Sequence, residues 1–382
     1  MAMDTRGATF LEELRGSLEG ILDKRSNAVL TAINPRSARQ LDAILRSFPS
    51  LGKSGALDLP AVGTQIARMG GAELRSFRSA AVEHTSDGRP RFAMGATAPP
   101  GSEWRTDVAV RVPENTDELE YGSVESDSDV IDLRHCTPWP VRNQAQRGTC
   151  VSFAATALRE ALDCEQHGSI RDLSEQFLYW VIKLHTNDPN PTEDGTFLEL
   201  ARDAVASHGI CEETAWPYDP TRLPGNAAHD GLGHPTQDAV TEAAARRLAA
   251  GVYEAPSGNS GKAQRVLDEL RKGRPVAVSL PVFVDAITGD DNWNTDVGIL
   301  FGDVIDPVPT SYPDGGHAVC ITGFVPDPLE HTGGYFVIRN SWGSHNWGSE
   351  LPDLPDYAGP EPGYGQISAT YIDRYLWEML RL

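Results

Sequence analysis

The chain has 382 residues, of which 40% are hydrophobic, enough for more than one buried core, and we expect two folded parts. Its 33 basic and 54 acidic side chains leave a formal charge of -21, which argues against nucleic acid as a partner because phosphate would be repelled. No stretch approaches the roughly 20 apolar residues of a membrane span, and the first residues lack a basic segment followed by an apolar run. We therefore expect no membrane partner and a cytoplasmic protein.

Apolar residues recur at helical spacing in three stretches of the N-terminal part, 9–33, 41–48 and 66–77. Residues 1–110 are therefore predicted to form a helical N-terminal unit. The first hundred residues carry 13 basic and 10 acidic side chains, so the negative charge lies in the rest of the chain. This contrast would draw the two parts together.

The composition changes after this unit. Residues 84–104 are rich in Pro, Gly and Ser, and the run ENTDELEYGSVESDSDVID at 114–132 is densely acidic, with few apolar anchors. We assign residues 111–130 to an acidic linker and residues 131–382 to the main domain.

The main domain begins with helical patterns and ends with strand patterns. A Pro-rich polar loop leads into an almost wholly apolar helix that starts at Cys150, and further helices are predicted at 173–184, 196–208 and 261–273. From Pro275 onward, short β-branched and aromatic runs predict antiparallel strands: PVAVSLPVF, GHAVCITGFV and GYFVIRNS. Helices first and strands later indicate an α+β fold with segregated halves.

The five cysteines occur singly, without a CxxC pair or clustered histidines: Cys136, Cys150, Cys164, Cys211 and Cys320. This odd and sparse set indicates reduced thiols and no metal site, and we expect no cofactor. Cys150 differs from the others because it begins a helix, where backbone N–H groups and the helix dipole favour a thiolate, with Thr149 before it as a cap. It is therefore a candidate nucleophile.

A thiolate nucleophile needs a base, a group that orients the base and donors for the oxyanion. His317, in the run GGHAV, can serve as the base, although on chemistry alone any of the ten histidines could. Asn340, 23 residues later at a strand end, can accept the other N–H of the imidazole. Gln144, six residues before Cys150, can donate to the oxyanion together with the Cys150 N–H.

Three segments, in the same order along the chain, resemble the motifs of the papain-like cysteine peptidase family: PVRNQAQRGTCVSFAA, GGHAVCITGF and YFVIRNSWGSHNWG. Weaker similarity, as in DLSEQFLYW and GYGQIS, extends the resemblance over residues 130–382. It implies a papain-like two-lobed fold, with a helical lobe and an antiparallel strand-rich lobe. It also assigns the family's catalytic roles to Cys150, His317, Asn340 and Gln144.

The resemblance implies roles for two further residues. Trp342 would supply the indole that shields the His–Asn hydrogen bond from water, and Gly195, in EDGTF, would represent the glycines that line the substrate cleft. Gly195 and Trp342 are thus the predicted substrate-binding residues.

Two departures from the family's pattern bear on the structure. Arg147 stands where the family usually has a disulfide-bonded cysteine, as expected of a reduced compartment, and the motif of the family's helical propeptide does not occur in residues 1–110.

The run DDNWNTD at 290–296 lacks the glycine and terminal glutamate of a calcium loop, so a solvated loop is predicted there.

The sequence therefore predicts a cysteine endopeptidase that hydrolyses proteins or peptides through a Cys150 acyl-enzyme, with His317 as general base and acid. Residues 1–110 are predicted to be a regulatory or inhibitory pro-region that docks on the main domain, as in a zymogen. Two alternatives stay open: a transpeptidase that passes the acyl group to an amine, and a protein-binding adaptor with a vestigial site.

Overall fold

The computed structural model describes residues 93–99, 130–221, 233–287, 289–295, 298–299, 302–327, 333–344, 346–348 and 362–382. The helices predicted before residue 78 lie outside this part of the chain, as does the acidic linker except for its last residue. The predicted boundaries of the N-terminal unit and the linker therefore stay predictions. None of the described helices is both long and apolar enough to cross a membrane.

Seven strands form one sheet in the order β2-β7-β3-β4-β5-β6, with β1 paired to β4 outside this path. All the neighbouring strands are antiparallel. The strands are β1 (Ile131–Asp132), β2 (Val252–Glu254), β3 (Val276–Asp285), β4 (Ser311–Pro326), β5 (Gly334–Arg339), β6 (Tyr364–Ser368) and β7 (Glu378–Arg381). The three predicted strands correspond to β3, β4 and β5, and GYGQIS forms β6.

The described helices are η3 (Arg134–Cys136), α6 (Cys150–His167), α7 (Glu175–His185), α8 (Leu198–Ser207), α9 (Gln237–Ala244), α10 (Lys262–Leu270) and α12 (Ala369–Tyr375). The predicted helices correspond to α6, α7, α8 and α10. Helix α7 begins two residues later than predicted because the Ser174 hydroxyl caps it, accepting a hydrogen bond from the Phe177 N–H. Helix α6 ends at Gly168, whose φ of 62° continues the chain in the left-handed region.

The sheet separates two hydrophobic cores. Along β4, Ala318 and Cys320 belong to the core of the helical lobe, whereas Val319 and Ile321 belong to the core on the opposite face. Successive side chains of a strand point to opposite faces, so one strand can serve both cores. The residues on the helical side are small, which lets α6 lie close to the sheet.

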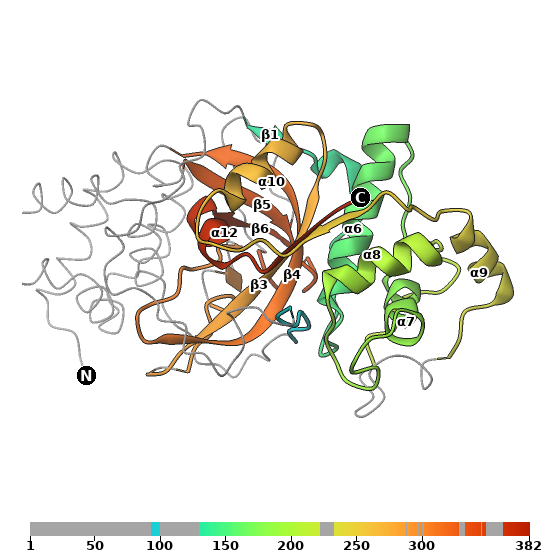
Figure 1. Cartoon of the computed structure of the whole chain (residues 1–382), viewed down its shortest axis with the longest axis horizontal. Coiled ribbons are helices and arrows are strands. Elements are labelled where there is room, and N and C mark those ends of the chain that lie inside the picture. Colours follow the sequence, from blue (N-terminus) through green and yellow to red (C-terminus); the bar gives the residue numbers. More distant parts are fainter. Residues whose placement is uncertain are drawn as a thin grey trace, which may run out of the picture.

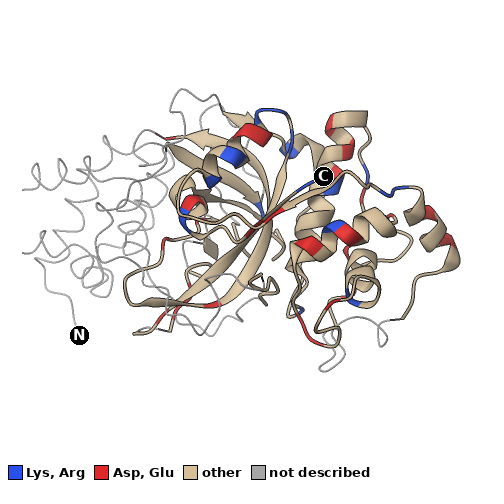
Figure 2. Ribbon diagram, viewed as in Figure 1, with Lys and Arg blue, Asp and Glu red and all other residues tan. Residues whose placement is uncertain are grey.

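The two lobes are visible in Figure 1, where α6, α7, α8 and α9 gather on one side and α10 and α12 pack with the strands on the other. Charged residues concentrate on the outer helices and loops, and the strands are largely free of them (Figure 2). The predicted α+β architecture with two lobes is confirmed.

The structure corrects the expectation of five reduced thiols. Cys136, at the end of η3, is joined by a disulfide to Cys164 of α6, across a sequence separation of 28 residues. Cys150, Cys211 and Cys320 are free and buried. Disulfides are typical of oxidising compartments, and the cytoplasmic location stays a prediction.

Alkylation of the denatured, unreduced chain should label the three free cysteines, Cys150, Cys211 and Cys320, and all five after reduction. Reduction should also lower the free energy of unfolding by about 3.5 kcal/mol, the loop-closure entropy expected for a cross-link of this span. Intact mass and denaturant titration measure the two effects. Five adducts without reductant would show that the bridge does not form.

Candidate active site

Cys150 is the first residue of α6 and is fully buried. The helix N-terminus places unpaired backbone N–H groups and the positive end of the dipole at the thiol. The backbone N–H of Ala318, on β4, lies near enough to the sulfur to lower the pKa of the thiol, which marks the approach of the sheet to the helix. Thr149 does not cap α6 with its side chain, contrary to the prediction, because its hydroxyl is bonded to the Tyr218 hydroxyl at 2.8 Å.

His317 and Asn340 come from neighbouring strands. His317 lies within β4, Asn340 directly follows β5, and His317 Nε2 is 2.7 Å from Asn340 Oδ1. The Ser341 N–H also donates to this oxygen, at 2.8 Å, which fixes the orientation of the amide. The carbonyl oxygen can only accept, so Nε2 carries the proton. His317 Nδ1, which has no hydrogen-bond partner among the described residues, is left as the basic nitrogen.

Three fully buried tryptophans, Trp293, Trp342 and Trp347, pack against one another, and the first two contact the imidazole. Trp342 stacks on His317 with ring centroids 4.6 Å apart and an interplanar angle of 28°, and Trp293 meets His317 edge-on at 5.1 Å. Trp342 therefore lies behind the imidazole and exposes no surface, so its predicted contact with substrate stays a prediction. Trp293 belongs to the run 290–296, and the prediction of a solvated loop is wrong for Asp291, Asn292 and Trp293, which are all buried.

Gln144 is held between Ser341 and the turn before Cys150. Its backbone N–H donates to the Ser341 carbonyl at 2.8 Å, and its Oε1 accepts from the Ser341 hydroxyl at 2.5 Å. Its Nε2 donates to the Arg147 carbonyl at 2.8 Å. Since the hydroxyl fixes Oε1, the amide nitrogen of Gln144 is the atom turned toward the turn that carries Cys150.

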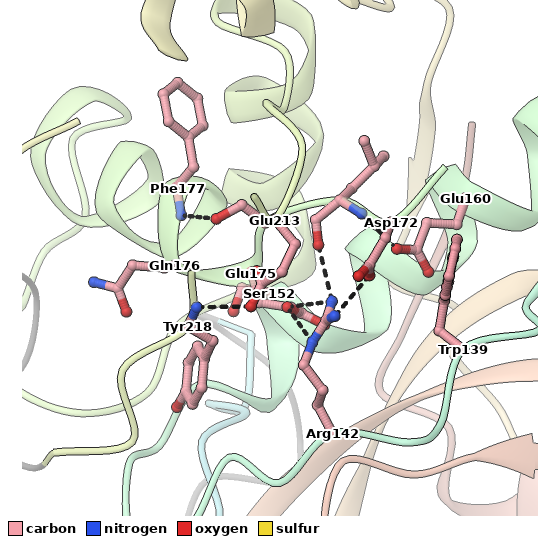
Figure 3. A network of polar contacts seen from close by, with 12 residues as sticks. Trp139, Arg142, Ser152, Glu160, Asp172, Glu175, Gln176, Phe177, Glu213 and Tyr218 are labelled. Carbon is pink, nitrogen blue, oxygen red and sulfur yellow. Dashed lines mark hydrogen bonds and ion pairs between the residues drawn. The ribbon is translucent and has the colours of Figure 1, made fainter. Parts of the chain in front are cut away.

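Two arginines anchor the segments that carry these residues. Arg142 precedes Gln144 by two positions and lies among carboxylates at the start of α7, 2.6 Å from Asp172 Oδ1 and 2.7 Å from Glu175 Oε2 (Figure 3). Arg339 directly precedes Asn340 and donates to the Tyr364 hydroxyl at 2.8 Å. Charge-assisted bonds of this kind restrict the segments more strongly than neutral ones.

Residues 93–99, here called the covering segment, run over Cys150. The Ala93 carbonyl accepts a hydrogen bond from Gln144 Nε2 at 2.9 Å. The Gly95 N–H donates to the Gly316 carbonyl at 3.1 Å and lies near enough to the Cys150 sulfur to lower the pKa of its thiol. A Cβ atom at Gly95 would lie 2.2 Å from the Gly148 carbonyl oxygen, so only glycine fits there. The predicted oxyanion donor and the predicted nucleophile thus both contact this segment.

Gly195 and Thr196, here called the pairing edge, hold the other side of the covering segment. The Thr196 N–H donates to the Gly95 carbonyl at 2.9 Å, and the Thr97 N–H donates to the Thr196 carbonyl at 3.0 Å, a parallel bridge. Gly195 has a φ of 90° and donates its N–H to the Gly148 carbonyl at 3.1 Å. The predicted residue Gly195 is therefore next to the residue that pairs with the covering segment. That residue is Thr196, which the sequence analysis did not predict.

Burial leaves both members of the predicted Cys–His pair uncharged. It raises the pKa of the Cys150 thiol to about 12, although the nearby backbone N–H groups of Ala318 and Gly95 oppose this shift. It also lowers the pKa of His317 to about 4, although the hydrogen bond to Asn340 opposes this shift. At pH 7 such a thiol is almost wholly protonated.

Labelling of Cys150 by iodoacetamide in the full chain should consequently be slow between about pH 5 and pH 7 and should rise steadily toward pH 10, because the thiolate is the reactive form. Peptide mapping by mass spectrometry separates this label from those on Cys211 and Cys320. A fast plateau already present at pH 6 would show that the thiol is ionised in the covered state and would contradict this account.

Comparison with known proteins finds relatives among the cathepsins. The chain is 24% identical over 212 residues to a cathepsin L-like protein of Caenorhabditis elegans, covering 55% of this chain and 53% of the relative. It is 27% identical over 211 residues to a viral cathepsin of Spodoptera litura multicapsid nucleopolyhedrovirus, covering 54% of this chain and 50% of the relative. The chain thus spans about half the length of these curated relatives.

Among solved structures, xylellain, a cysteine protease from Xylella fastidiosa, has the same fold, with a TM-score of 0.51, 18% sequence identity and coverage of 76% of this chain and 97% of that chain. The family model for papain family cysteine proteases matches residues 127–350. The chain therefore belongs to the papain family of cysteine proteases.

Proposed function

We propose that this chain is a cysteine endopeptidase that hydrolyses peptide bonds of proteins or peptides at Cys150. One observation carries the proposal: an extended segment of polypeptide, residues 93–99, already lies against Cys150. Its carbonyl at Ala93 is bonded to Gln144 Nε2, and its backbone is paired with Thr196. A surface that recognises polypeptide backbone next to a thiol and an imidazole is suited to peptide substrates.

The reaction follows from the orientation of the side chains. With a substrate in place of the covering segment, Cys150 passes its proton to His317 Nδ1, the nitrogen that Asn340 leaves free. The thiolate sulfur then bonds to the substrate carbonyl carbon, and the negative oxygen receives hydrogen bonds from Gln144 Nε2 and the Cys150 N–H. As the carbon–nitrogen bond breaks, His317 returns the proton to the leaving amine. The product is a thioester on Cys150.

Water completes the cycle. His317 Nδ1 takes a proton from a water molecule, whose oxygen bonds to the thioester carbon, and the carbon–sulfur bond breaks. The new carboxylic acid leaves, and Cys150 regains its proton. The roles of Cys150, His317, Asn340 and Gln144 in this sequence remain part of the proposal.

Hydrolysis in water enriched in oxygen-18 tests this function. We expect each cleaved peptide to carry one heavy oxygen in its new carboxyl group, and the Cys150→Ala variant to lose activity by at least about 10³-fold because no acyl-enzyme can form. Mass spectrometry of the products reads both results. Products joined to an added amine, without heavy oxygen, would favour a transpeptidase, and no turnover by any uncovered form would favour an adaptor.

We further propose that the covering segment keeps the enzyme latent, as the predicted docking of residues 1–110 on the main domain requires. The support is that this segment contacts the Gln144 donor and the Cys150 sulfur at once. A substrate must displace the segment before it can reach either group. Activation then consists of release of residues 93–99, with or without cleavage of the chain.

The variant Gly95→Val tests latency, because its Cβ would overlap the Gly148 carbonyl oxygen, 2.2 Å away. Loss of the backbone hydrogen bonds around Gly95 removes about 3 kcal/mol, so peptide hydrolysis by the full chain should rise by about 100-fold. Thr97→Ala is the matched control, since Thr97 is exposed and keeps its backbone pairing. Equal rates for wild type, Gly95→Val and Thr97→Ala would contradict latency.

A further inference from the structure

A lysine is buried beside the pairing edge. Lys183, in the last turn of α7, and Asp188, in the loop that leads to α8, form an ion pair of 3.1 Å, with side chains 0% and 1% exposed. Removing two charges from water is costly, and a buried ion pair adds little net stability compared with apolar side chains of similar size. The pair therefore calls for an explanation other than stability.

The ammonium group of Lys183 binds three acceptors of the same loop. Besides Asp188, Nζ donates to the Asn190 carbonyl at 3.1 Å and to the Gly195 carbonyl at 2.5 Å. An ammonium has three N–H donors, so these three acceptors use its whole capacity. Lys183 thus draws the start and the end of the loop to a single point.

Asp188 completes the arrangement on the side of Thr196. Its Oδ2 accepts the Thr196 hydroxyl at 2.7 Å, and its Oδ1 accepts the Asn190 N–H at 2.8 Å. The Gly195 carbonyl and the Thr196 side chain are consequently both bound on the side of the lysine. The Thr196 N–H and carbonyl are the groups that remain for the covering segment.

We propose that the Lys183–Asp188 pair is the positioning device of the pairing edge, holding the Thr196 backbone in the register in which it binds an extended peptide. The inference rests on the proposed peptidase function for its substrate, while the covering segment uses the same edge within the chain. Lys183 and Asp188 touch neither Cys150 nor the bound backbone in any described contact. They act through Gly195 and Thr196.

Hydrogen exchange of the full chain tests the proposal without any need for enzymatic activity. In a Cys150→Ala background, Lys183→Met should speed exchange of the amides in residues 93–99 and 186–197 by at least about tenfold, because their shared hydrogen bonds open locally. The amides of α6 should keep their rates. Lys262→Met is the matched control, since Lys262 is as buried as Lys183, each being 2% exposed as a whole residue, but lies on α10, where it donates to the Leu376 carbonyl at 3.1 Å.

The double variant Lys183→Met/Asp188→Asn covers the case in which Lys183→Met fails to fold, because it leaves no unpaired buried charge. It should fold and show the same local loss of protection. The proposal is overturned if Lys183→Met and Lys262→Met speed exchange equally throughout the chain, or if residues 93–99 keep their protection in a folded Lys183→Met or double variant.

Kinetics of the uncovered full chain, Gly95→Val, add a second readout. With Lys183→Met, KM for a peptide substrate should rise by at least about tenfold, whereas the rate of Cys150 alkylation by iodoacetamide should change by less than about threefold, because that reagent needs no backbone partner. Equal losses in both rates would indicate a general structural defect and contradict positioning. If no peptide is turned over but Lys183→Met still speeds hydrogen exchange in residues 93–99, the peptidase function is rejected. The positioning of the pairing edge by Lys183 and Asp188 is then kept.

Discussion

The N-terminus of α6 reaches the sheet because the strands present alanine and cysteine side chains where they meet it. Ala277, Ala318 and Cys320 belong to the same core as Cys150. This close packing brings a thiol at a helix terminus to the strand that carries His317. Larger side chains on this face would separate the two, since packed interiors accommodate extra volume only by displacement. The site thus depends first on which face of β4 carries the small residues.

The same packing excludes water from the site, and the ionisation of Cys150 and His317 depends on whether water or a substrate enters it. Three tryptophans and the covering segment exclude water, which favours the uncharged forms of Cys150 and His317. A thiolate–imidazolium pair needs either solvent or the hydrogen bonds of a substrate. The covering segment would then keep the enzyme inactive in two ways. It blocks the substrate from Cys150, and it keeps the pKa of the thiol high.

The sequence made the candidate catalytic residues predictable because each of them sits in a local pattern. Cys150 begins an apolar helix, His317 and Asn340 lie in strand motifs, and their order along the chain matches the family. The structure joins His317 to Asn340 and Gln144 to Ser341, and it sets Ala318, the neighbour of His317, beside the Cys150 sulfur. It also shows that Thr196, next to the predicted Gly195, provides the pairing.

Other features could not be predicted, because they depend on contacts between distant residues without a local pattern. The Cys136–Cys164 bridge joins single cysteines that no motif marks. Trp293 sits in a run predicted to be solvated, yet it packs on His317 because the run pairs back onto the end of β3. The Lys183–Asp188 pair could not be predicted because it forms only when the loop after α7 folds back onto the end of that helix.

The central claim is that Cys150 is an activated thiol which residues 93–99 cover. Reaction of the full chain with an epoxide thiol probe, followed by intact mass and site mapping, tests it most directly in wild type, in Gly95→Val and in Gly95→Val/Cys150→Ala. The account predicts one adduct, on Cys150, which forms at least about tenfold faster in Gly95→Val than in wild type and is absent from the double variant. Equal labelling of wild type and Gly95→Val, or an adduct that persists without Cys150, would contradict it.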